Sequence, residues 1–214
     1  MAVPSSLAGR ADVYPCRGRN AFSLHEDFAF SPYRVTGVRR GWKTREAWGI
    51  AFFERSRARQ RFEFTLEGGG GRAWAGQAAT GVRQTDLKGC AWGGKLTWGI
   101  SRESNFVVRI GPVNAHPAWT LILAEESADL TPNGWLSNGT TRYRIQGTRE
   151  LAGSPMPLTD TSGFLIYRGN RPVAAVDSVN AGAVSFDPDL PPSHRQPLAT
   201  AAAALLLYRD IGSD

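Results

Sequence analysis

The sequence contains few of the residues that build common catalytic and metal sites. Its 214 residues include two cysteines, two methionines and three histidines. His25, His116 and His194 are far apart and lack the spacing of metal ligands. No pattern marks a nucleophilic serine elbow or an EF-hand calcium loop. We therefore predict a protein without a metal site, a cofactor or an enzymatic activity.

Long apolar runs are also missing. Crossing a bilayer takes about 20 consecutive apolar residues, and no segment reaches that length. Residues 1–11 lack the apolar core of a signal peptide. The compartment stays open, because the sequence as printed fits the cytoplasm, and the cell envelope would fit if an export signal had been removed. Cys16 and Cys90 are compatible with one disulfide in an oxidising compartment or with two separate thiols.

The most apolar segment lies near the C-terminus, at Pro197–Asp210 (PLATAAAALLLYRD). Its alanine run has a high helix propensity. A helix that is apolar on every side must be surrounded by protein or lipid. About 13 residues at 1.5 Å each give roughly 20 Å, which would fill the bore of a barrel. The segment therefore predicts a buried core helix, with Arg209 close to the negative end of the helix dipole.

The rest of the chain has the signature of an all-β protein. Short runs of aromatic and β-branched residues are separated by turn signals such as Gly68–Gly71 and Asn138-Gly139. Phe62, Phe64 and Leu66 alternate with polar residues, as expected for a strand with one buried face. The predicted strands cover residues 28–38, 47–54, 60–67, 73–83, 95–101, 105–110, 119–125, 134–136, 141–148, 163–167, 172–176 and 183–186.

The order of these elements suggests a domain plan. Residues 1–21 are small and polar without periodicity, so we expect a flexible lead-in followed by a single domain over residues 22–214. The segment Gly163–Asp189 (GFLIYRGNRPVAAVDSVNAGAVSFDPD), followed by LPPSHRQPLATAAAALLLYRD, resembles the Tubby C-terminal-like superfamily, which includes phospholipid scramblases and plant LURP-one-related proteins. The resemblance implies a closed antiparallel β-barrel of about twelve strands around a central hydrophobic C-terminal helix. It carries over no ligand-binding residue.

Charge is distributed unevenly along the chain. The net charge is +6, with a sequence pI of about 9.8. Residues 1–107 contain 17 Lys and Arg against 9 Asp and Glu, whereas residues 108–214 contain 8 against 10. An excess of positive charge in one half suggests a polyanionic partner, such as phospholipid headgroups or nucleic acid.

The basic residues concentrate between Arg34 and Arg61, with Trp42 and Trp48 among them. Arginine binds phosphate through two parallel hydrogen bonds, and tryptophan favours membrane interfaces. A solvated strand face explains the pattern equally well, and nucleic acid is disfavoured because no recognised binding motif is present. The predicted function is a non-catalytic binding protein that associates with anionic phospholipid or the membrane surface. The alternative is a structural or protein-interaction module of the cell envelope. The predicted anion-binding residues, called the basic cluster below, are Arg39, Arg40, Lys43, Arg45, Arg55, Arg57, Arg59 and Arg61.

Overall fold

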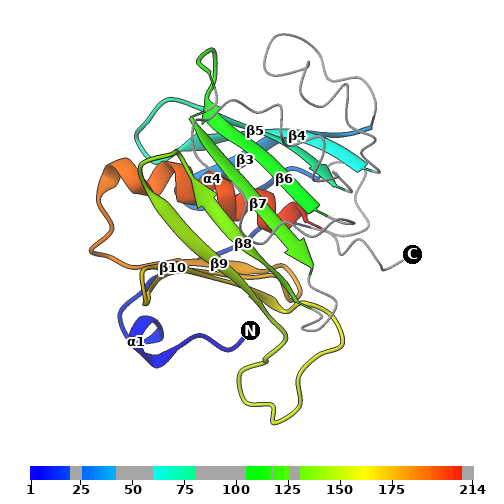
Figure 1. Ribbon diagram of the computed structural model, residues 1–214, viewed down its shortest axis with the longest axis vertical. Helices are drawn as coiled ribbons and strands as arrows, with labels where there is room; N and C mark the ends of the chain where they lie inside the picture. Colours follow the sequence, from blue (N-terminus) through cyan, green and yellow to red (C-terminus); the bar gives the residue numbers. More distant parts are fainter. Residues whose placement is uncertain (20–25, 42–59, 81–104, 117, 126–130, 209–214) are drawn as a thin grey trace.

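A single antiparallel sheet forms the wall of the protein (Figure 1). The structure is a computed structural model that describes residues 1–19, 26–41, 60–80, 105–116, 118–125 and 131–208. Within these ranges the chain forms twelve strands that all join one sheet. Their bounds are β1 Asp12–Pro15, β2 Phe28–Phe30, β3 Tyr33–Arg40, β4 Gln60–Gly68, β5 Trp74–Thr80, β6 Asn105–Pro112, β7 Trp119–Glu125, β8 Pro132–Ser137, β9 Arg142–Thr148, β10 Gly163–Arg168, β11 Arg171–Asp177 and β12 Ala183–Phe186.

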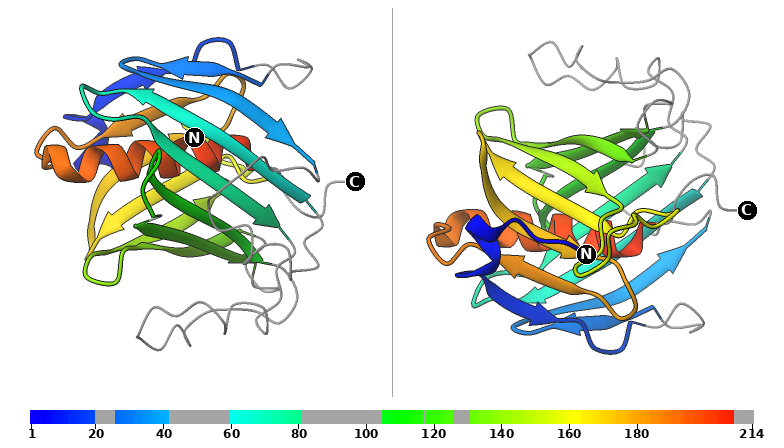
Figure 2. Two further views of the ribbon diagram at one scale, coloured as in Figure 1. Left: turned by 90° about the horizontal axis from the view of Figure 1, so that it is seen from above. Right: turned by 90° about the horizontal axis from the view of Figure 1, so that it is seen from below.

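The sheet closes on itself almost completely. From β2 to β12 each strand pairs with the next strand along the chain, and β1 pairs with the other side of β12. The two edge strands meet where Arg17 and Ala29 exchange backbone hydrogen bonds of 2.8 and 2.9 Å. The result is a nearly closed antiparallel barrel that surrounds a helix (Figure 2). The predicted fold class is confirmed.

Alternating side chains give the barrel an apolar interior. On β4, Phe62, Phe64 and Leu66 are 3%, 2% and 0% exposed and belong to the main core. Glu63 and Thr65 lie between them on the outer face and are only partly buried. This is the period of two that the sequence predicted for the strand.

The interior is filled by helix α4, Pro192–Leu207, in which every residue from Pro197 to Leu207 is buried. The helix begins at Pro192 rather than at Pro197, because proline has no N–H group and so suits the first helical position. It ends at Leu207, and Tyr208 has extended backbone angles. Arg209 and Asp210, the last two residues of the predicted helix, lie outside the described residues. No helix in the described part of the chain has the length and hydropathy needed to span a membrane.

Small side chains let α4 approach the wall. The helix contacts β5, β6 and β11, and its segment Ala201–Ala204 is fully buried. On β5, Gly76 and Ala78 share the inward face. A Cβ atom on Gly76 would lie 2.3 Å from a ring carbon of Phe64, so this position has room for glycine alone. Gly76 therefore leaves room for the Phe64 ring of β4 within the wall that α4 contacts.

The strand predictions differ from the structure in two described places. The predicted strand 28–38 is divided into β2 and β3 by a turn at Ser31-Pro32, where proline supplies no hydrogen-bond donor for a continuous ladder. Strand β1 was not predicted, because it falls in the expected lead-in. The predicted strands 47–54 and 95–101 lie outside the described residues.

Residues 1–19 contain strand β1 of the barrel wall and a short helix that packs against the outside of the barrel. Helix α1, Ser5–Ala8, packs against the outside of the barrel, and Leu7 is 0% exposed against Leu165 of β10 and Ala175 of β11. The chain then continues into β1. The apolar residues of the segment are mostly small and follow no regular period, so the sequence pattern could not reveal this packing.

We expect the substitution Leu205→Ala to lower the free energy of unfolding by about 2–5 kcal/mol, because it leaves a cavity between the helix and the wall. Leu205 is 1% exposed. Chemical denaturation monitored by tryptophan fluorescence measures the change. The matched control, Leu158→Ala, removes the same atoms from a side chain that is 36% exposed, and should shift stability by no more than about 0.5 kcal/mol. Equal effects for the two variants would contradict a central position for the helix.

Candidate anion-binding surface

The structure describes three residues of the basic cluster: Arg39, Arg40 and Arg61. Arg39 and Arg40 end β3, and Arg61 lies at the start of β4. The other members, Lys43, Arg45, Arg55, Arg57 and Arg59, lie outside the described residues. The end of β3 and the start of β4 are paired side by side, with Arg40 opposite Phe62. The three described arginines are therefore neighbours at one end of the barrel.

Arg40 holds the C-terminal end of the central helix. Two of its nitrogen atoms each donate to the carboxylate of Glu26 at 2.7 Å, and Nη2 also donates to the carbonyl of Leu207 at 2.9 Å. Its guanidinium lies 5.0 Å from the ring centre of Phe62. The last carbonyl groups of a helix have no partner within the helix and carry partial negative charge. Arg40 therefore stabilises α4, which reduces its availability to an external anion.

Arg19, just after the bridge between Arg17 and Ala29 of β2, has the same role as Arg40. It donates to the carbonyls of Leu206 at 3.1 Å, Ser178 at 3.1 Å and Asn180 at 3.0 Å. The sequence assigned the favourable cation at this helix end to Arg209. In the described residues, two arginines from the barrel wall provide it.

Arg39 lies on the outer surface beside an acidic residue. It is exposed and pairs in register with Glu63 of β4. Burial raises the pKa of Glu63, and the charge of Arg39 partly opposes that rise. Arg39 is thus the described member of the basic cluster that is best placed to meet a ligand.

Two further arginines, which the sequence pattern did not single out, lie on the outside of β9 beside aromatic residues of β8 and β10. Arg142 lies 4.9 Å from the ring centre of Trp135, and Arg144 lies 4.2 Å from that of Tyr167. The register places Arg144 between Trp135 and Tyr167 on the neighbouring strands. We call Trp135, Arg142, Arg144 and Tyr167 the arginine–aromatic face.

The chemistry of the arginine–aromatic face suits an anion. The side chains of Tyr143 and Ile145, which alternate with the two arginines, are 0% exposed inside the barrel, so the arginines point outward. Strands β8, β9 and β10 contain no aspartate or glutamate. A guanidinium that stacks on an aromatic ring keeps its N–H edges open to a phosphate or carboxylate. Arg144 also donates to Gln146 at 2.9 Å, which fixes its orientation.

The carboxylates before the helix, by contrast, are paired within the protein. Asp187 is 1% exposed and accepts from Arg10 at 2.6 Å and from Arg171 at 3.0 Å. Asp189 accepts from the same two arginines at 3.1 and 2.9 Å. This network connects the N-terminal segment, β11 and the approach to α4.

Tyr143 and His194 form a buried polar contact near the start of α4. The Tyr143 hydroxyl is hydrogen-bonded to Nδ1 of His194. Burial raises the pKa of Tyr143 and lowers the pKa of His194, so both groups are neutral near pH 7. Within the described ranges, no three His, Cys, Asp or Glu side chains are grouped as metal ligands would be.

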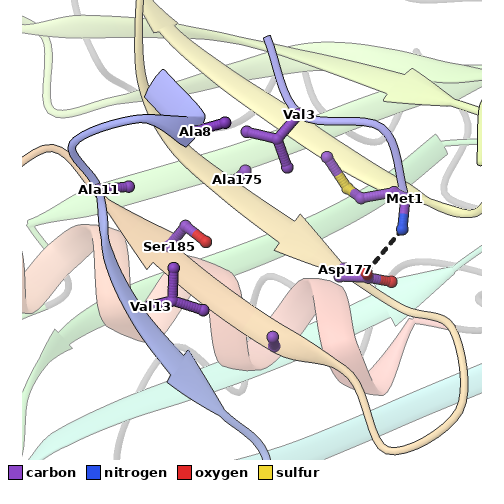
Figure 3. Close-up of a pocket in the computed structure, with 9 residues that line it drawn as sticks. Met1, Val3, Ala8, Ala11, Val13, Ala175, Asp177 and Ser185 are labelled. Atoms are coloured by element: carbon purple, nitrogen blue, oxygen red, sulfur yellow. Dashed lines mark hydrogen bonds and ion pairs between the residues drawn. The ribbon is translucent and has the colours of Figure 1, made fainter. Parts of the chain in front are cut away.

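A small hollow of about 200 Å³ lies between the N-terminal segment and the outside of β11 and β12 (Figure 3). Its lining is mostly apolar and includes Met1, Val3 and Ala175. Its one charged side chain, Asp177, accepts from the Met1 amino group at 2.6 Å. Because the Asp177 carboxylate is engaged in this ion pair, the lining offers apolar packing surface and no charged group to bind a ligand.

Cys16 carries a free thiol and is 5% exposed. Burial is the main cause that raises its pKa from 9.0 to about 11. Cys90, its partner in the predicted disulfide, lies outside the described residues.

Comparison of the chain with protein-family models, curated proteins and solved structures finds no significant match. The geometry described above therefore carries the functional argument.

We expect Arg40→Gln to lower the free energy of unfolding by about 1–3 kcal/mol, because the Leu207 carbonyl and the Glu26 carboxylate each lose a charged donor. Urea denaturation measures this effect. Arg34→Gln is the matched control, because it makes the same change at an exposed position on the same strand. If both variants retain the stability of the parent protein, Arg40 does not hold the helix end.

Cys16 should react slowly with thiol reagents in the folded protein. Because its folded pKa lies above that of an ordinary thiol, its contribution to stability is complete below pH 9.0 and is lost as the pH rises toward 11. In a Cys90→Ser variant, iodoacetamide labelling at pH 8 should be slow when folded and fast in urea. Rapid labelling of the folded variant at pH 8 would show that the thiol is accessible.

Proposed function

We propose that this protein is a non-catalytic binding protein that associates with anionic phospholipid surfaces through the outer wall of its barrel. The observation that carries the proposal is the arginine–aromatic face, where two outward arginines stack on Trp135 and Tyr167. Arginine pairs with phosphate in a bidentate geometry, and tryptophan and tyrosine favour the headgroup level of a bilayer.

The filled interior supports an external binding site. Helix α4 occupies the lumen, and its residues from Pro197 to Leu207 are buried against the wall. A hydrophobic ligand would need that space. The outer surface of the barrel is therefore where recognition is expected.

The state of the described ionisable groups supports a function in binding rather than catalysis. Asp187 and Asp189 are paired with arginines, and Tyr143 is paired with His194. General acid–base chemistry needs a group that can reach a substrate proton. These pairs instead connect structural elements to one another.

We further propose that the chain belongs to the Tubby C-terminal-like superfamily. A twelve-stranded antiparallel barrel around a buried C-terminal helix supports this membership. A shared fold does not transfer a function. The lipid-binding proposal accordingly depends on the arginines of this chain.

The basic cluster has a place in this proposal. Arg39 is exposed on the outer face of β3, whereas Arg40 is engaged with the helix end. Lys43, Arg45, Arg55, Arg57 and Arg59 add positive charge in the sequence between β3 and β4. We propose that this charge strengthens the attraction to an anionic surface.

We expect the protein to co-sediment with vesicles that contain phosphatidylglycerol and to remain in the supernatant with vesicles of phosphatidylcholine alone. Binding should weaken as salt rises, since exposed charges are screened over about 10 Å at 0.1 M salt. The double variant Arg142→Gln/Arg144→Gln should bind several-fold more weakly, because it removes both outward arginines of the face.

The matched control is Arg34→Gln/Arg72→Gln, which removes two charges from exposed arginines elsewhere on the barrel. If the two double variants lose the same affinity, binding depends on net charge and not on the arginine–aromatic face. If the parent protein does not bind anionic vesicles at low salt, the proposed function is wrong.

A further inference from the structure

The connection between β9 and β10 exposes two apolar side chains, Met156 and Leu158, near its middle. Residues 149–162 project beyond the ends of these two strands (Figure 1). Met156 is 73% exposed and Leu158 is 36% exposed. They are two of the four large hydrophobic side chains that are exposed in the described part of the chain. Exposed apolar residues close together are typical of an interaction site, whereas isolated ones need no explanation.

Hydrogen bonds within the connection hold its tip, Ser154–Leu158, in place. The backbone N–H of Leu158 donates to the carbonyl of Arg149 at 2.8 Å, which closes the base of the tip. The Ser154 hydroxyl donates to the Met156 carbonyl at 3.0 Å. At the return to β10, the Ser162 hydroxyl bonds to the carbonyls of Thr148 and Glu150 at 3.0 and 2.9 Å. The exposure of Met156 is therefore a property of an ordered turn.

The backbone of the tip has no unpaired N–H group. Pro155 and Pro157 have no N–H. The N–H groups of Ser154 and Leu158 donate to carbonyls, and that of Met156 donates to the Ser154 hydroxyl at 3.3 Å. Away from water, an unpaired backbone donor costs several kcal/mol, which is why irregular backbone is excluded from lipid. The N–H groups of this tip therefore need no partner from water, and its carbonyls can stay hydrated at the level of the lipid headgroups.

We propose that Ser154–Leu158 inserts into the interfacial layer of an anionic bilayer, with Met156 and Leu158 as its apolar contacts. This inference rests on the proposed lipid-binding function and names the part of the protein that enters the membrane. The nine residues Leu151–Thr159 contain no charge. Glu150 and Asp160 flank this stretch, and their carboxylates stay in water while the tip inserts.

The position of the tip fits the arginine–aromatic face. Both lie on β9 and its continuation, and Arg144 is about five residues from Arg149, or roughly 17 Å along an extended chain. One flat surface can therefore meet Arg144 and the tip together when the β9–β10 wall tilts toward it. Arginine would bind the headgroups while Met156 and Leu158 enter below them.

Binding of the full-length double variant Met156→Ser/Leu158→Ser to vesicles of equal parts phosphatidylglycerol and phosphatidylcholine tests the inference. Affinity should fall at least about tenfold, since the variant removes both apolar side chains that would leave water on insertion. Val113→Ser is the control, because Val113 is 38% exposed in the turn after β6, at the opposite end of the barrel. Thermal unfolding should be unchanged in both variants, because the altered side chains are exposed.

Insertion itself is measured with an environment-sensitive NBD label on a Met156→Cys variant in a Cys90→Ser background. Its emission should shift to the blue with anionic vesicles and be quenched by lipids that carry a nitroxide on the acyl chain. The same label on Val113→Cys should stay in water.

The outcomes separate the two proposals. Parent protein that binds anionic vesicles while the label at position 156 stays in water overturns the inference, leaves the lipid-binding function intact and favours a protein partner for the tip. If Met156→Ser/Leu158→Ser binds anionic vesicles as tightly as the parent protein, the inference is likewise overturned while the lipid-binding function stands. Parent protein that fails to bind any anionic vesicle overturns both proposals.

Discussion

The structure depends on burial of one helix that is apolar on every side. Such a helix is unstable in water, so the wall must enclose it and must also satisfy the polar groups at its ends. At the C-terminal end, Arg19 and Arg40 donate to the carbonyls of Leu206 and Leu207. At the other end, Pro192 begins the helix without an N–H group to satisfy. The wall thus provides apolar surface along the helix, and it provides charged donors for the last helix carbonyls, which have no partner within the helix.

This constraint divides the described arginines into two groups. Arg19 and Arg40 serve the helix end, while Arg10 and Arg171 neutralise the buried carboxylate of Asp187 before the helix begins. Arginines of this first group maintain the fold, and their N–H groups are already engaged within the protein. Arg142 and Arg144 form the second group, because they stack on aromatic rings and point away from the interior. A count of basic residues along the sequence treats both groups alike, whereas Arg142 and Arg144, like exposed Arg39, are positioned for an external anion and the first group is not.

The sequence predicted the strands and the buried helix because both depend on local patterns, whereas the closed barrel was implied by the resemblance to a known family. The alternation of Phe62, Phe64 and Leu66 and the all-apolar run after Pro197 are visible without any tertiary information. Strand β1 could not be predicted, since its place beside β12 depends on pairing between residues far apart in the chain. The arginine–aromatic face was missed for a related reason. Trp135, Arg144 and Tyr167 become neighbours only through the register of three strands, and the half of the chain that contains them has a small net negative charge.

The same rule about backbone donors connects the interior of the protein with its projecting tip. Inside the barrel there is no water to pair with a free N–H or carbonyl, so helix geometry and two arginines supply the partners. At Ser154–Leu158 the chain is irregular and exposed, and water could satisfy every donor there. Nevertheless, proline removes two of the donors and internal hydrogen bonds occupy the other three. A surface turn that faces only water gains little stability from having every backbone N–H group paired or removed. The absence of free donors beside exposed Met156 and Leu158 suits a tip that spends part of its time in the interfacial layer of a bilayer, where water is scarcer than in bulk but can still hydrate the carbonyls of the tip.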